Sequence, residues 1–83
     1  MERNEALSAI RDCAIEVLGV EPNAVTEAAR FKDDLEADSL DLVELVMALE
    51  EEFDISVPEE DLDGLDTVGK AVTLVLDKVP ART

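Results

Sequence analysis

The chain has 83 residues, 47% of them apolar, and its formal net charge at pH 7 is −15. This length predicts one small domain, residues 1–83, whose core must be aliphatic because the chain contains two Phe and no Trp or Tyr. So acidic a balance argues against nucleic acid and anionic membranes as partners and favours basic protein surfaces.

The negative charge is concentrated in the middle of the chain. Residues 33–66 contain 15 of the 22 acids and none of the seven bases, and the other seven acids are balanced by the seven bases. A generally solvated acidic surface would spread its charge more evenly. We therefore interpret this segment as a surface that meets a basic partner.

The N-terminal part carries no targeting or membrane signal. No basic stretch precedes an apolar run, and no apolar segment reaches 18 residues, so we expect neither a signal peptide nor a membrane span. Cys13 is the only cysteine, which precludes an intramolecular disulfide and fits a cytoplasmic protein. Its place at the edge of an apolar stripe predicts a buried thiol rather than a reactive one.

The first predicted element is a helix over residues 3–18. Apolar residues recur there at helical spacing, and Gly19 supplies a stop. The pattern lapses over residues 20–37, where we expect a long loop held to the core by Val25, Phe31 and Leu35. Loops of this length in so small a domain are often functional.

The second predicted helix begins at Ser39 and ends before Asp54. Asp38 is a good N-cap, and Asp41 three residues later imitates a capping box with a shorter acid. Residues 55–57 have strand propensity but no partner run, so we expect no strand there.

Two further helices complete the expected fold. A short helix over residues 59–63 is stopped by Gly64, and Thr67 caps a last helix with an apolar stripe that ends before Pro80. The sequence thus predicts an all-α bundle of the antiparallel type, with three main helices, one short helix and a long first loop. We expect its core to include residues on the inward stripes, namely Leu7, Ile10, Leu49, Phe53, Val72 and Leu76.

The second helix has more apolar surface than a core-facing stripe needs. At 100° per residue its apolar side chains fill an arc of roughly 220°, against about 100° for an ordinary stripe. Leu40, Val43 and Met47 form one edge of this arc, which acids border on both sides. Either the helix is buried centrally between two others, or this edge is an exposed docking surface for a partner with a basic rim.

The residues present argue against nucleophilic catalysis by Ser39 and against a zinc or EF-hand site. Without His, and with every base outside residues 33–66, Ser39 lacks a group to take its proton. One Cys and no His make a zinc site improbable. An EF-hand starting at Asp34 would need Gly at Ser39 and Glu at Leu45, so that loop fails, and only weak, unspecific divalent binding is left open.

A serine that cannot attack can still be modified. The free N–H groups and the positive dipole end of a helix N-terminus favour an attached phosphate, although Asp38 and Asp41 oppose it. On the serine alone, an ordinary first-turn residue is the favoured reading of Ser39.

The residues around the serine change that balance. Phe31 followed by D-D-L, then A-D-S-L-D, V-E-L-V-M-A-L-E-E-E-F-D, and later V-P-E-E-D and T-V, closely resemble the acyl carrier proteins of dissociated fatty acid synthesis. The resemblance covers nearly the whole chain, including the first helix ending in L-G-V. It implies a carrier with no catalytic residues, a monomer without a bound metal.

In that family, 4′-phosphopantetheine is attached to the serine that matches Ser39 and carries the acyl chain as a thioester. The resemblance implies that a phosphopantetheinyl transferase adds the arm and that fatty acid synthase enzymes with basic docking patches are the later partners. The implied docking residues lie on the second helix and at its start: Asp38, Leu40, Asp41, Val43, Glu44, Met47, Glu50 and Glu51.

One position departs from the family pattern. Many members have Gly where this chain has Glu36, and a positive φ would cost Glu about 1 kcal/mol relative to Gly. We therefore expect a different turn at Glu36. Two other functions stay open: a discrete carrier for polyketide or other specialised acyl chains, and an acidic interaction or divalent-ion-binding module whose serine is never modified.

Overall fold

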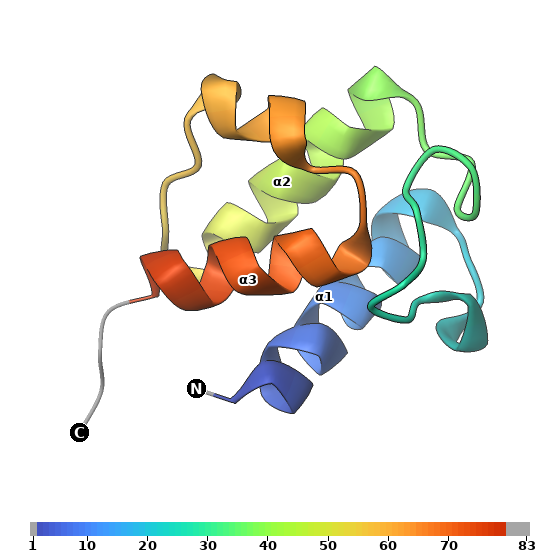
Figure 1. The fold of residues 1–83 in the computed structure, drawn as a ribbon, viewed down its shortest axis with the longest axis horizontal. Helices are drawn as coiled ribbons and strands as arrows, with labels where there is room; N and C mark the ends of the chain where they lie inside the picture. The colour runs from blue at the N-terminus through green and yellow to red at the C-terminus, as the bar shows by residue number, and fades with distance from the viewer. Residues whose placement is uncertain (1, 80–83) are drawn as a thin grey trace.

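The protein is an all-α bundle. A computed structural model describes residues 2–79, apart from the side chain of Glu59, and no β-strand occurs within them. The elements in chain order are α1 (Arg3–Leu18), the 3-10 helix η1 (Pro22–Ala24), α2 (Ser39–Phe53), the 3-10 helix η2 (Glu59–Gly64) and α3 (Val68–Lys78). Helix α1 packs against both α2 and α3 (Figure 1). None of the helices in this part of the chain is long and apolar enough to cross a bilayer.

The predicted fold is confirmed, with two refinements. All three main helices have the expected bounds, but the short fourth element is a 3-10 helix, and η1 within the long loop was not predicted. Gly19 ends α1 in the left-handed region with φ 70°. Thr67 caps α3, because its hydroxyl oxygen accepts the backbone N–H of Lys70 at 3.2 Å.

The start of α2 is held by the predicted capping box. The N–H of Asp41 donates to Asp38 Oδ1 at 2.9 Å, and the N–H of Asp38 donates to Asp41 Oδ2 at 3.2 Å. These reciprocal bonds satisfy two backbone donors that would otherwise lack a partner. The first residue after the cap is Ser39, so the box sets where the serine sits on the helix.

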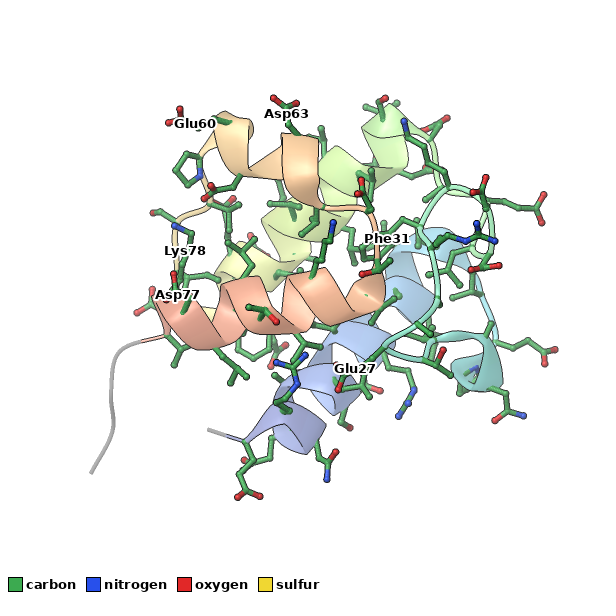
Figure 2. The ribbon with its side chains drawn as sticks, viewed as in Figure 1. Glu27, Phe31, Glu60, Asp63, Asp77 and Lys78 are labelled. Atoms are coloured by element: carbon green, nitrogen blue, oxygen red, sulfur yellow. The ribbon has the colours of Figure 1, made fainter. Side chains whose placement is uncertain are left out.

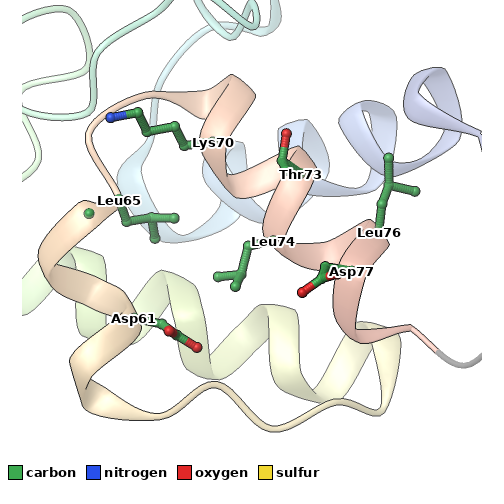
Figure 3. A pocket seen from close by; sticks show the side chains of 8 residues that line it. Asp61, Leu65, Lys70, Thr73, Leu74, Leu76 and Asp77 are labelled. Carbon is green, nitrogen blue, oxygen red and sulfur yellow. The ribbon is translucent and has the colours of Figure 1, made fainter.

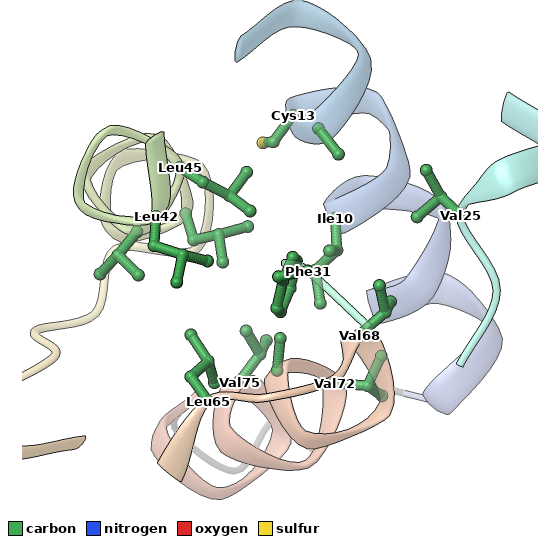
Figure 4. Packing of buried hydrophobic residues seen from close by; sticks show 14 of the residues in the cluster. Ile10, Cys13, Val25, Phe31, Leu42, Leu45, Leu65, Val68, Val72 and Val75 are labelled. Carbon is green, nitrogen blue, oxygen red and sulfur yellow. The ribbon is translucent and has the colours of Figure 1, made fainter. Parts of the chain in front are cut away.

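Aliphatic side chains from all three helices surround Phe31 in the core (Figure 4). Of the predicted core residues, Ile10, Leu49, Phe53 and Val72 are buried, and Cys13 is buried as expected. The prediction was wrong for Leu7 and Leu76, which are only partly buried. Mostly smaller residues face the centre instead, and these two leucines lie on the flanks of their helices. The buried residues of α1 are Ala6, Ile10, Cys13 and Ala14, and those of α3 are Val68, Ala71, Val72 and Val75.

The long loop is attached to the turn between η2 and α3. The N–H of Phe31 donates to the carbonyl of Asp66 at 3.0 Å, and the N–H of Val68 donates to the carbonyl of Ala29 at 2.9 Å. A third bond runs from the N–H of Gly69 to the carbonyl of Glu27 at 2.8 Å. A Cβ at position 69 would lie 2.9 Å from that carbonyl oxygen, so this close approach requires glycine.

The expected loop anchors are confirmed: Val25, Phe31 and Leu35 are all buried. The expectation of a different turn at Glu36 was wrong, since Glu36 has φ 55°. Its neighbours Leu35 and Ala37 are both buried, and the N–H of Ala37 donates to the carbonyl of Phe31 at 2.7 Å. These tertiary constraints hold Glu36 in the left-handed conformation despite its intrinsic cost.

Leu49→Ala tests the packing of α2. Leu49 is 2% exposed, so its truncation should lower the free energy of unfolding by about 2–5 kcal/mol, a large share of the stability of a small domain. Leu76→Ala is the matched control and should cost less, because that side chain already contacts water. Urea denaturation at moderate salt measures both, and a loss below about 0.5 kcal/mol for Leu49→Ala would contradict the assigned facing of α2.

Glu36→Gly tests the strain in the loop. Glycine adopts positive φ without a Cβ clash, so the free energy of unfolding of the variant should be higher by about 0.5–1 kcal/mol. This figure already includes the opposing effect of glycine, which gives the unfolded chain more conformational entropy. Glu36→Gln is the control, since it removes the charge and keeps the strained backbone. If urea denaturation shows the Gly variant no more stable than the Gln variant, the left-handed geometry carries no cost.

Candidate functional site at the start of α2

Ser39 is exposed at the first turn of α2. Among residues 2–79, no acceptor is found for the backbone N–H groups of Ser39 and Leu40, as expected for the first turn of a helix. These donors and the positive end of the helix dipole favour an anion attached at this place. The carboxylates of Asp38 and Asp41 oppose it, because each is an acid within the same turn.

An apolar strip runs from the serine along α2. It consists of Leu40, Val43 and Met47, whose side chains are 66%, 40% and 58% exposed. The predicted exposed edge is therefore confirmed, and the alternative of a centrally buried second helix was wrong. The helix that contacts both others is α1, which leaves this side of α2 open to solvent.

The acids near the apolar strip are of two kinds. Glu44 and Glu51 are exposed, and their side chains make no hydrogen bond or ion pair with the rest of residues 2–79. Glu50 is half-buried, and its Oε2 accepts the N–H of Val57 at 2.8 Å, so it holds the segment that follows α2. Asp41 also has a structural part, because it belongs to the predicted capping box at the start of α2.

A hollow of about 310 Å³ lies beside the serine. Apolar side chains from α2 and from the region of η2 form its walls, and polar groups lie at its edges. Its lining residues are Lys32, Ser39, Leu42, Val43, Leu62, Asp63, Leu65 and Asp66. Figure 2 shows Asp63 pointing outward from η2. Sequence reasoning missed Lys32, although it is the last base before the acidic segment.

A larger open hollow of about 640 Å³ lies between η2 and α3 (Figure 3). Leu74 and Leu65 line it, and no residue of α2 does, so the serine is not part of it. Lys78 and Asp61 join η2 to α3 by an ion pair of 3.2 Å. The size of this hollow alone does not make it a site. Of its charged lining residues, Lys70 is paired with Asp66 and Asp61 with Lys78.

The titratable groups of the described residues show no catalytic centre. Burial, and then the nearby acids Glu52, Glu16 and Asp12, raise the pKa of the Cys13 thiol, so the thiol is neutral at physiological pH. The backbone N–H and the side chain of Arg30 hold the pKa of Asp34 below its ordinary value. No three of these Asp, Glu and Cys side chains are grouped to hold a metal ion.

The serine, the apolar strip and the acids fall within a region that matches known proteins. A family model described as the phosphopantetheine attachment site matches residues 8–75. The chain is 51% identical over 75 residues to an acyl carrier protein of Caulobacter vibrioides, which covers 90% of this chain and 96% of the relative. Over 78 residues it is 49% identical to an acyl carrier protein of Phenylobacterium zucineum, covering 94% and 99%. A third relative, an acyl carrier protein of Rubrobacter xylanophilus, is 47% identical over 77 residues, covering 93% and 95%.

Proposed function

Because this chain belongs to the acyl carrier protein family, we propose that Ser39 carries its 4′-phosphopantetheine and that the protein serves fatty acid synthesis in the cytoplasm. Acyl carrier proteins are carriers and not catalysts, and phosphopantetheine is the group that they bear. The arm supplies a thiol that holds the acyl chain as a thioester. The protein's own residues position the arm and meet the enzymes that act on the chain.

The observation that carries the proposal is the exposed hydroxyl of Ser39 at the start of α2, next to the apolar strip. The chain has two other serines. Ser8 lies inside α1, where backbone N–H groups are already bonded within the helix, and Ser56 lies in the segment after α2. Ser39 is thus the serine with free backbone donors nearby and a docking surface beside it.

Attachment joins Ser39 Oγ to the phosphorus of the arm and breaks the pyrophosphate bond of coenzyme A, which releases adenosine 3′,5′-bisphosphate. The hydroxyl of Ser39 makes no hydrogen bond to another side chain of residues 2–79, so we infer that the transferase supplies the group that takes its proton. The N–H groups of Ser39 and Leu40 and the helix dipole favour the resulting phosphodiester.

The surface of α2 supports docking to enzymes with a basic rim around an apolar groove. The apolar strip supplies contact area, and the free carboxylates of Glu44 and Glu51 supply steering toward a basic partner. We also infer that the carrier is a monomer, because a net charge of −15 makes two copies repel each other.

Ser39→Ala should abolish attachment of the arm. After co-expression with a phosphopantetheinyl transferase, the intact mass of the wild-type chain should rise by one phosphopantetheine, and that of Ser39→Ala should not. Ser8→Ala and Ser56→Ala are matched controls, and both should gain the arm. No increment in the wild type with several competent transferases would indicate an unmodified acidic module instead.

Glu44→Lys combined with Glu51→Lys should weaken recognition without unfolding the carrier. Exposed charges change stability by under about 1 kcal/mol, and the loss of like-charge crowding should keep the melting temperature equal or raise it. The kcat/KM of a fatty acid synthase enzyme for the holo-carrier should fall about tenfold or more at low salt. Most of the difference from the wild type should disappear in concentrated salt. Unchanged kinetics would place docking elsewhere.

A matched control reverses two exposed acids away from α2. Glu16→Lys with Asp77→Lys makes the same charge change near the C-terminal ends of α1 and α3, and it should leave recognition nearly intact. Met47→Ala should weaken recognition with little dependence on salt, because the lost interaction is apolar contact. If enzymes of polyketide synthesis use the carrier better than those of fatty acid synthesis, the proposed pathway is wrong.

A further inference from the structure

Lys32 differs from every other base that the structure describes. Between residues 2 and 79 there are six bases, and five of them bind an acid or a carbonyl oxygen. Those pairs are Arg3 with Glu27, Arg11 with the carbonyl of Val25, Arg30 with Asp33 and Asp34, Lys70 with Asp66, and Lys78 with Asp61. Lys32 has no such partner within these residues, although 15 acids follow it in residues 33–66.

Lys32 lines the hollow that Ser39 also lines, and the residue before it is fixed in the core. The residue before it, Phe31, is fully buried and is bonded through its N–H to the carbonyl of Asp66 at 3.0 Å. The position of Lys32 in the loop is therefore defined by its buried neighbour, and Lys32 itself is exposed. Lys32 also lines a second hollow together with Arg30 and Asp33.

The acids that face Lys32 do not neutralise it. Asp66 lines the same hollow but is paired with Lys70 at 3.1 Å, and Asp33 is paired with Arg30 at 3.4 Å. Asp63 lines the same hollow and points outward from η2 (Figure 2). A free ammonium group in a hollow shared with a serine at a helix N-terminus is well placed for an anion attached to that serine.

We infer that Lys32 binds the phosphodiester that links the arm to Ser39. This inference rests on the proposed attachment at Ser39. The backbone N–H groups of the first turn face the phosphodiester from the helix, and the ammonium group of Lys32 faces it from the loop. Lys32 thus offsets the repulsion from Asp38 and Asp41, and the anchored end of the arm is positioned at the loop side of α2.

Competitive labelling of amines near neutral pH tests the inference. Only the unprotonated amine reacts, and the chain has three lysines, so Lys70 and Lys78 serve as controls in the same sample. An anion bound beside a lysine favours its protonated, unreactive form, and exposure to water keeps this effect small. Lys32 should therefore react about threefold more slowly in the holo-protein than in the apo-protein, while the rates of Lys70 and Lys78 stay unchanged.

The phosphorus resonance of the holo-protein separates binding from mere covering by the arm. Salt screens an exposed ion pair, so the ³¹P shift of the wild type should move with added salt, and this movement should be lost in Lys32→Gln. Arg30→Gln is the matched control, because it removes the same charge from the same loop and should keep the wild-type response. Intact mass confirms in every sample that the arm is attached to Ser39.

The outcomes are distinct. An absent arm in the wild type refutes the proposed attachment itself. An attached arm with equal Lys32 labelling in apo- and holo-protein overturns the role of Lys32. Slower labelling combined with the same ³¹P salt response in Lys32→Gln and wild type overturns it as well, because the arm then covers the lysine without contacting it.

Discussion

The backbone hydrogen bonds between residues 27–31 and 66–69 are the constraint on which the rest of the structure depends. They tie the long loop to the start of α3, and they place Phe31 at the centre of the core. The loop has local turns of its own, but they do not fix its position against the helices, so these long-range bonds place the N-terminus of α2. With the loop fixed, Leu35 and Ala37 are buried in turn, and α2 begins at a defined position.

Different sides of helix α2 serve the core and the proposed recognition of partners. One side buries aliphatic residues against the core, and the opposite edge leaves the apolar strip in water. Its acids divide in the same way, since Asp41 and Glu50 bond backbone N–H groups while Glu44 and Glu51 are free. Free carboxylates beside exposed apolar side chains lower the stability of the fold slightly. Such a combination is typical of a surface that binds partners.

The chemistry of the site follows from what the helix start offers and what it lacks. Ser39 has an exposed hydroxyl, unbonded N–H groups beside it and a favourable dipole, but among the described residues its hydroxyl has no hydrogen-bonded partner to activate it. The protein can therefore accept and hold a group that another enzyme attaches. Lys32, which lines the same hollow as Ser39, is the base that we infer to bind the attached phosphodiester.

The sequence by itself determined the helix bounds, the caps, the place of the serine and the exposed edge of α2. These depend on interactions within a few residues, namely the 3.6-residue period and the capping bonds. Only the tertiary structure decided which leucines are central, the left-handed backbone of Glu36, the bond of Glu50 to Val57, and the hollow that Lys32 shares with the serine. Each of these depends on segments that meet in space through the packing of the loop and the helices, and a local pattern does not specify those meetings.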